Sequence, residues 1–230
     1  MPDYIEHYKK LDKSAYPSEW IIRAFLGKYK NYESPARNKE NFEIDKNIFL
    51  NKKILDLGYG DGRNLVFFRD LGMLVYGIEP LNKVVTHSCK LFPWANLLKG
   101  ENCNIPFKNN EFDYLVASHS IYYLSEGQTL LDSLKEALRV IKSSGKIFFT
   151  VPTSQNHYIK NAKKYSAHQW KIKDEFYNVR DGQIIETVDC KEDLRFILNK
   201  LPIKCYKIAF WQVDWWGTVE SSFIISATKE

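Results

Sequence analysis

Short apolar runs alternate with amphipathic stretches from residue 53 onward. Runs of strand length cover 53–57, 74–79, 95–99, 112–118 and 146–151. Apolar residues at helical spacing lie between them, over 62–71, 82–91 and 129–141. Strands and helices that alternate in this way form parallel sheets with helices on both faces. The pattern therefore predicts an α/β fold.

The two ends of the chain follow other patterns. A helix is predicted over 17–26, because Pro17 suits the first turn of a helix and Gly27 suits its end. Residues 152–190 are polar and aromatic without a clear period. After a predicted helix over 191–200, the strand-like runs 206–213 and 222–228 are close enough to pair antiparallel. We therefore expect a mostly parallel sheet that finishes with one reversed strand.

The length of 230 residues suits a single domain over 1–230. Within it we expect four parts. The parts are an N-terminal helical cap (1–50), a core of alternating strands and helices (51–151), an irregular insertion (152–190) and a final helix with strands (191–230). Long irregular segments of compact domains are often lids or binding segments, so the insertion is a candidate binding segment.

The composition is that of an ordinary globular protein, with 44% hydrophobic and 27% charged residues. No apolar run is long enough for a membrane helix, and the first residues lack the apolar stretch of a secretory signal. We expect a cytoplasmic protein without membrane insertion. The four cysteines have no paired spacing, which argues against a disulfide framework and against a metal site. The net charge of +5 is mild and gives only weak support for nucleic-acid binding.

The segment 54–63, Ile-Leu-Asp-Leu-Gly-Tyr-Gly-Asp-Gly-Arg, is the most informative part of the chain. A strand runs directly into three closely spaced glycines, which permit positive φ and let a ligand approach the backbone. Asp56 and Asp61 bracket this turn. Two acids repel a phosphate and attract an ammonium group, so the turn predicts a ligand with a cationic tail.

Glu79 ends the second strand, twenty-one residues after Gly58. An acid at this position of a doubly wound fold accepts hydrogen bonds from the ribose hydroxyls of a nucleotide-like ligand. A nicotinamide dinucleotide is the competing ligand. Its fingerprint places the third glycine one residue later than Gly62, and Asp61 would repel its pyrophosphate. Both differences disfavour the dinucleotide.

The glycine turn, followed by Val-Tyr-Gly-Ile-Glu-Pro at 75–80, resembles the first two motifs of class I S-adenosylmethionine-dependent methyltransferases. Three further segments are similar to later motifs of this family, in the family's order. They are 100–107, 112–118 and 137–146. The resemblance covers residues 50–152 well and the last strands loosely. It implies a Rossmann-like, doubly wound sheet of seven strands with helices on both faces, and S-adenosylmethionine as the methyl donor without a metal. Residues 51–151 would then be the cofactor-binding core and 152–190 the acceptor-site insertion.

The resemblance also implies roles for individual residues. The methionine part of the cofactor would lie on Gly58, Tyr59 and Gly60, with Asp56 and Asp61 near its ammonium end. Glu79 would hold the ribose, and Pro80 would pack on the adenine. Glu101, Asn102 and Cys103 would border the adenine edge, and Ser118 and His119 the sulfonium. The chain departs from the family pattern at Tyr59, whose ring must turn outward or line the pocket, and at Glu101 and Ser144.

Methyl transfer requires alignment of the acceptor and, for some acceptors, a general base. His119 is the best-placed base, because ligands of open α/β sheets bind beyond the carboxyl ends of the strands. Tyr123 is a weaker candidate. Four residues are candidates to bind the acceptor: Tyr16, Arg23, His157 and Arg180. The two arginines suit an anionic acceptor, since guanidinium groups match anionic oxygens. His157 lies in the irregular segment, and Tyr16 lies among the aromatic residues near the N-terminus.

The leading hypothesis is methylation of an oxygen or nitrogen of a small metabolite that is anionic or linked to a nucleotide or sugar. A tRNA or RNA methyltransferase is an alternative, although no added RNA-binding element is visible and nucleic acid is therefore not the expected partner. A methyltransferase-like binding subunit without activity is a second alternative.

Overall fold

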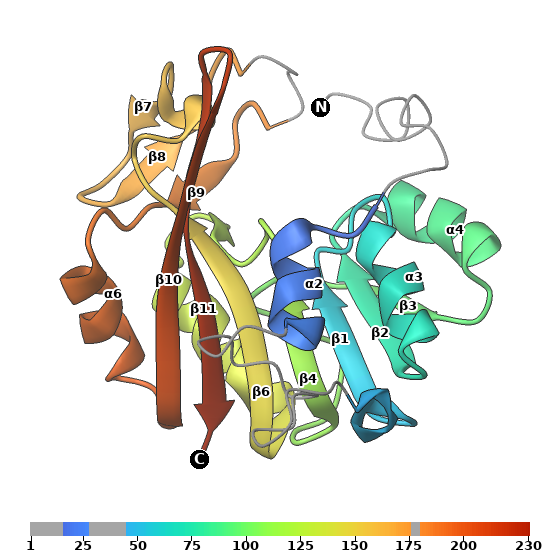
Figure 1. Cartoon of the computed structure of the whole chain (residues 1–230). Helices are drawn as coiled ribbons and strands as arrows, with labels where there is room; N and C mark the ends of the chain where they lie inside the picture. The colour runs from blue at the N-terminus through green and yellow to red at the C-terminus, as the bar shows by residue number, and fades with distance from the viewer. Residues whose placement is uncertain (1–15, 28–44, 176–179) are drawn as a thin grey trace.

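The computed structural model describes residues 16–27, 45–175 and 180–230. Its centre is a seven-stranded sheet in the order β10-β11-β6-β4-β1-β2-β3 (Figure 1). Only β11 runs antiparallel to its neighbours, and it lies between β6 and β10. The predicted doubly wound sheet with one reversed strand is confirmed. Its strands are β1 (Lys53–Leu57), β2 (Leu74–Glu79), β3 (Asn96–Lys99), β4 (Phe112–Ala117), β6 (Ile141–Pro152), β10 (Ile203–Trp215) and β11 (Thr218–Lys229).

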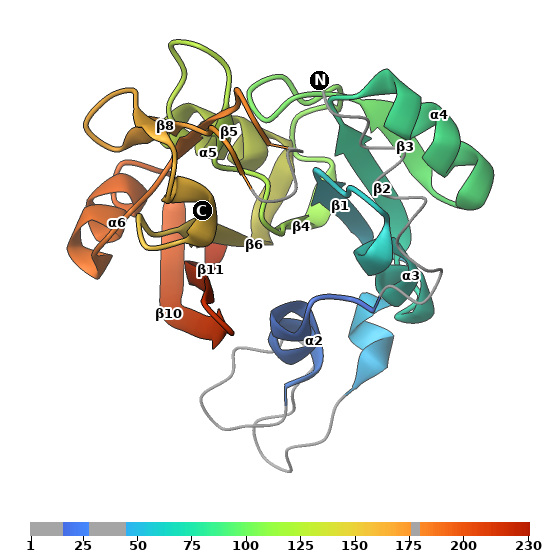
Figure 2. The same ribbon diagram turned by 90° about the horizontal axis from the view of Figure 1, so that it is seen from above.

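Helices cover both faces of this sheet, and Figure 2 shows α2 and α5 on opposite sides of it. Apolar residues of α2 (Glu19–Leu26), α3 (Arg63–Asp70) and α4 (Asn82–Leu91) join one hydrophobic cluster. Those of α5 (Leu130–Val140) and α6 (Lys191–Leu198) join the other. A short 3-10 helix, Lys46–Phe49, precedes β1. The rest of the expected N-terminal cap, residues 1–15 and 28–44, lies outside the described residues.

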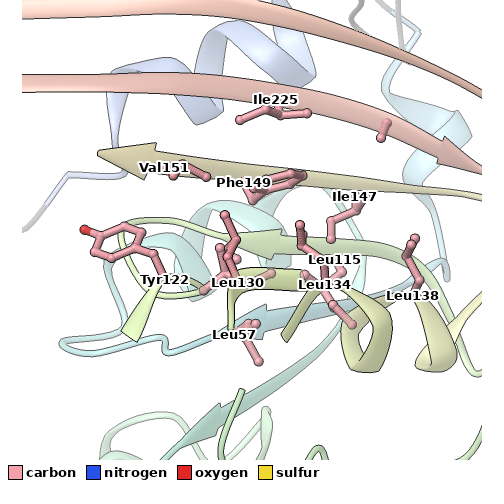
Figure 3. Packing of buried hydrophobic residues seen from close by; sticks show 14 of the residues in the cluster. Leu57, Leu115, Tyr122, Leu130, Leu134, Leu138, Ile147, Phe149, Val151 and Ile225 are labelled. Atoms are coloured by element: carbon pink, nitrogen blue, oxygen red, sulfur yellow. The ribbon is translucent and has the colours of Figure 1, made fainter. Parts of the chain in front are cut away.

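The larger cluster shows why α5 forms where its pattern predicts. Leu130, Leu134 and Leu138 recur at helical spacing, are nearly fully buried and face Ile147 and Phe149 of β6 (Figure 3). A capping box between Thr129 and Asp132 satisfies the free N–H groups at the start of the helix. This packing fixes the carboxyl ends of β4 and β6, which border the site described below.

Residues 152–190 supply three of the four strands of a second sheet that the sequence pattern did not predict. Its strands are two or three residues long, too short to show an alternation, and one of them comes from the loop after β4. The order is β5-β9-β8-β7, with all pairs antiparallel. The strands are β5 (Tyr123–Leu124), β7 (Lys163–Lys164), β8 (Gln169–Lys171) and β9 (Ile184–Glu186). Figure 1 shows this small sheet above the end of the main sheet toward which β1 points.

Strand boundaries differ most from prediction near the C-terminus. β6 begins at Ile141 rather than Lys146, with an irregularity in its register against β4, so residues 142–145, which lie between the predicted helix and strand, belong to it. β10 and β11 are longer than predicted at both ends. Their pairing starts at Ile203 and Lys229 and continues to Trp215 and Thr218, next to the turn at Trp216 and Gly217. In the part of the chain that the structure describes, no helix is long and apolar enough to cross a membrane.

Tyr59 and Gly77 form a complementary pair in the core. The Tyr59 ring turns inward, with 3% of its surface exposed, and packs with the cluster beneath α3 and α4. A Cβ atom at Gly77 would lie 2.6 Å from the ring atom Cδ1 of Tyr59 and 2.9 Å from Leu97 Cδ2. The missing side chain at Gly77 therefore provides the space that the large residue in the glycine turn requires.

We predict that Gly77→Ala lowers the free energy of unfolding by about 1–3 kcal/mol, because the added methyl overpacks the Tyr59 ring. Urea denaturation measures this loss. In a Tyr59→Ala background the same substitution should cost less, since the nearest obstacle is gone. An equal loss in both backgrounds would contradict the pairing.

Candidate active site

The glycine turn has the backbone that its sequence predicts. Gly58, Gly60 and Gly62 have φ values of 70°, 57° and 79°. At Gly58 a side chain is also excluded, because a Cβ there would lie 2.6 Å from the Cβ of Ser120. The Ser120 hydroxyl donates to the carbonyl of Leu57, and this contact holds the loop after β4 against the turn.

Two carboxyl groups are buried beneath this turn. Asp56 is 1% exposed, and neither of its oxygens has a hydrogen-bond partner of normal geometry among the described residues. Burial raises the pKa of Asp56 to about 8, although the Asn64 side chain lowers it in part. Glu79 is 8% exposed and accepts a hydrogen bond from the Gly60 N–H at 3.3 Å. Burial raises the pKa of Glu79 to about 7, and the Gly60 contact offsets part of that shift.

Asp61 occupies a different environment from the one expected for an ammonium contact. Its carboxylate accepts from the Arg63 guanidinium, with Nη2 at 2.6 Å and Nε at 3.0 Å. Arg63 thus neutralises the outer acid of the turn. The uncompensated carboxyl at the turn is Asp56.

The residues after β2 and β3 form one wall of a large cleft. Pro80, Leu81, Gly100 and Glu101 line it together with Asn102. The Asn102 side chain donates to the carbonyls of Ser120 and Tyr123, both at 2.8 Å, so it braces the loop after β4. Cys103 is not among the lining residues, and its sulfur lies 3.3 Å from the Ser133 hydroxyl.

The cleft has a volume of about 1470 Å³. It runs from the glycine turn past the carboxyl ends of β1 and β4 to the small sheet. Helix α2 borders it through Ser18, Trp20 and Arg23. The Ser18 N–H donates to Asn64 at 3.3 Å and its hydroxyl lies 3.4 Å from that of Ser118, so the start of α2 is tied to the cleft wall.

His119 lies at the carboxyl end of β4 in a left-handed conformation with φ of 56°. Its N–H donates to the buried Thr150 hydroxyl at 2.9 Å, which stabilises this unfavourable backbone. Burial lowers the pKa of His119 to about 4, and the charges of Arg180 and Arg63 lower it further. The imidazole is therefore neutral at pH 7 and can accept a proton, but weakly.

Arg180 is held rigidly at the far end of the cleft. Its Nε donates to the Tyr123 hydroxyl at 3.0 Å and its Nη1 to Glu175 at 2.8 Å, while the guanidinium lies 5.2 Å from the centre of the Tyr158 ring. Burial raises the pKa of Tyr123, so its hydroxyl stays protonated and can position Arg180. Tyr122 stacks on Tyr123 and supports it from behind.

Of the other three residues predicted to bind the acceptor, two line the cleft and one does not. Arg23 lines the cleft and pairs with Glu19 one helical turn earlier. His157 also lines it, with Nδ1 3.1 Å from the Val219 carbonyl. Tyr16 is 80% exposed and is not among the lining residues. Glu175, Tyr158 and Ser120 contribute to the site but follow no motif or period from which the sequence could identify them.

Comparison with known proteins identifies the fold and the cofactor class. A family model described as a methyltransferase domain matches residues 55–149. Residues 55–149 are therefore similar to a methyltransferase domain, in agreement with the class I S-adenosylmethionine-dependent motifs of the sequence. The comparison with curated proteins gives no match.

Solved methyltransferases share the fold at low sequence identity. A methyltransferase of Thermotoga maritima, described as a possible histamine N-methyltransferase, is 21% identical, with 78% of this chain and 83% of that chain covered and a TM-score of 0.55. A Methanosarcina mazei S-adenosylmethionine-dependent methyltransferase is 16% identical, with 79% of this chain and 95% of that chain covered and a TM-score of 0.61. A Burkholderia thailandensis 1,6-didemethyltoxoflavin-N1-methyltransferase, solved with bound S-adenosylhomocysteine, is 11% identical. The match covers 80% of this chain and 76% of that chain, with a TM-score of 0.57.

The residues of this cleft suit S-adenosylmethionine. The Asp56 carboxyl has no hydrogen-bond partner of normal geometry among the described residues and lies beneath the turn, not among the residues that line the cleft, so its charge would attract the ammonium group of the cofactor from below the turn. Glu79 uses one oxygen for the Gly60 N–H and retains acceptor capacity for a ribose diol. Among the described residues no group of three or more His, Cys, Asp or Glu side chains could hold a metal ion.

We predict that Glu79→Gln changes the pH dependence of stability of the cofactor-free protein. The carboxyl has an ordinary pKa of 4.5 and a folded pKa of about 7, so between these values the folded protein binds more protons and loses stability as pH rises. The variant cannot ionise there. Its melting temperature relative to wild type should therefore rise between pH 5 and pH 8.

The same variant should bind S-adenosylhomocysteine more than tenfold less tightly, since an amide is a poorer acceptor for a diol. Glu101→Gln, which changes an exposed acid of the same cleft, is the matched control and should keep the wild-type pH dependence. A constant difference in melting temperature at both pH values would refute the buried-carboxyl assignment.

Proposed function

We propose that this methyltransferase methylates an oxygen or nitrogen of a small anionic metabolite, such as a nucleotide- or sugar-linked compound. The size of the cleft carries the proposal. Its volume of about 1470 Å³ exceeds the roughly 300–1,000 Å³ of a pocket for one small ligand. An acceptor therefore has room beside the cofactor, on the side of His119 and Arg180.

Different residues serve the cofactor end and the acceptor end of the cleft. Glu79 would accept from the ribose hydroxyls, Pro80 and Leu81 would flank the base, and the charge of Asp56 beneath the turn would attract the ammonium group. When bound, S-adenosylmethionine supplies an activated methyl group on a cationic sulfur. Arg180 orients an anionic acceptor, because Tyr123 and Glu175 hold its guanidinium in place.

His119 is the proposed proton acceptor, and its basicity depends on Arg180. The charge of Arg180 is one cause of the low pKa of His119. An anion bound to Arg180 offsets this charge and raises the pKa of the neighbouring imidazole. The base thus becomes stronger when the correct acceptor is in place. This coupling favours an anionic acceptor over a neutral one.

A screen with methyl-labelled S-adenosylmethionine tests the function, with small-metabolite pools and total RNA offered separately. The proposal expects label in a small anionic compound and none in RNA. Incorporation into RNA alone would replace the proposal with the RNA methyltransferase alternative. Failure to bind S-adenosylhomocysteine by calorimetry would favour the inactive binding subunit.

With the acceptor in hand, His119→Ala should lower kcat by about 10²-fold, the contribution of a positioned general base. Its affinity for S-adenosylhomocysteine should change little, because the ribose and ammonium contacts remain. Wild-type kcat in this variant would remove the base assignment. Arg180→Met should mainly raise KM for the acceptor, which distinguishes anchoring from proton transfer.

A further inference from the structure

The small sheet contributes one of its faces to the cleft. In its ladder, Leu124 pairs with Ile184, and Ile184 pairs with Lys171. Directly paired residues of neighbouring strands share a face. These three residues line the cleft, so this row is part of the cleft wall. Lys163 pairs with Lys171 and continues the row at the outer edge.

Lys163 and Lys171 are therefore two cations directly opposite each other on the cleft face. Both are exposed, and neither forms an ion pair with any described residue. Like charges in this position destabilise an antiparallel pair. Lysines on an edge strand discourage pairing with other sheets, and this accounts for β7. It does not account for Lys171, which lies on the inner strand β8.

The surrounding segment strengthens the positive potential. Residues 157–173 contain five lysines and no aspartate or glutamate, and four of these lysines remain after Lys173, which pairs with Asp174 at 3.1 Å. Lys164 lies on the other face, with its ammonium 5.2 Å from the centre of the Trp170 ring. The concentration of one sign of charge on a short hairpin at the mouth of a cleft attracts anions.

We infer that the Lys163–Lys171 pair binds a phosphate group of the methyl acceptor, which is a small phosphate monoester or diphosphate. This inference rests on the proposed function, since it names the substrate class of the same cleft. Two ammonium groups match the charge of about −2 that a phosphate monoester carries at pH 7. A long polyanion such as RNA fits less well. Acids also line the cleft, among them Glu19, Glu126, Asp181 and Glu220, and an extended polyanion would meet more of them than a single phosphate group would.

Calorimetric titration of pyrophosphate into the protein, with S-adenosylhomocysteine at saturation, tests the inference without any acceptor or turnover. Wild type should bind pyrophosphate, and Lys163→Ala or Lys171→Ala should each weaken binding about fivefold. Lys90→Ala, an exposed lysine of α4 outside the cleft, is the matched control and should bind like wild type. Affinity for S-adenosylhomocysteine should be unchanged in all three variants.

Lys163→Glu separates a binding role from a structural one. It places opposite charges across the ladder, so it should raise the melting temperature while abolishing pyrophosphate binding. Absence of pyrophosphate binding to wild type, or equal binding by the lysine variants, would overturn the inference. So would an RNA oligonucleotide that displaces pyrophosphate with a steep salt dependence. Failure of the proposed function would appear differently, as loss of S-adenosylhomocysteine binding in wild type.

Discussion

The burial of two carboxyl groups, Asp56 and Glu79, beneath a glycine turn is the constraint on which this site depends. Removing a carboxylate from water is unfavourable unless an opposite charge or hydrogen-bond donors replace the water. In the cofactor-free protein both groups respond with a raised pKa. A ligand with an ammonium group and a diol offers what each lacks. The fold thus keeps an unfavourable arrangement that the proposed cofactor contacts would relieve.

The rest of the molecule positions other groups around this arrangement. Ser120 and Asn102 hold the loop after β4 against the turn, and the same loop carries His119 and β5. The small sheet and α2 then border a space beyond the cofactor end. A single connected set of contacts therefore relates the donor end of the cleft to Arg180 at the acceptor end.

The parallel core was predictable because its strands and helices are long enough to show a period. The glycine turn and Glu79 were identifiable because their spacing is local. The small sheet was not, since strands of two or three residues, such as β5 and β7, show no alternation. The Asp61–Arg63 pairing and the inward rotation of Tyr59 depend on neighbours that spacing does not reveal. The cleft role of Arg180 stays a prediction, now with named partners in Tyr123 and Glu175.

Proton release on cofactor binding tests the central claim most directly. Calorimetry of S-adenosylhomocysteine binding at pH 7, in buffers with different heats of ionisation, measures it. Before binding, Asp56 has a pKa of about 8 and is mostly protonated at pH 7. Glu79 has a pKa of about 7 and is half protonated. If the ligand's ammonium and diol favour the charged carboxylates, about 1.4 protons leave per molecule bound when both groups ionise fully. A binding heat that is independent of the buffer would contradict the account.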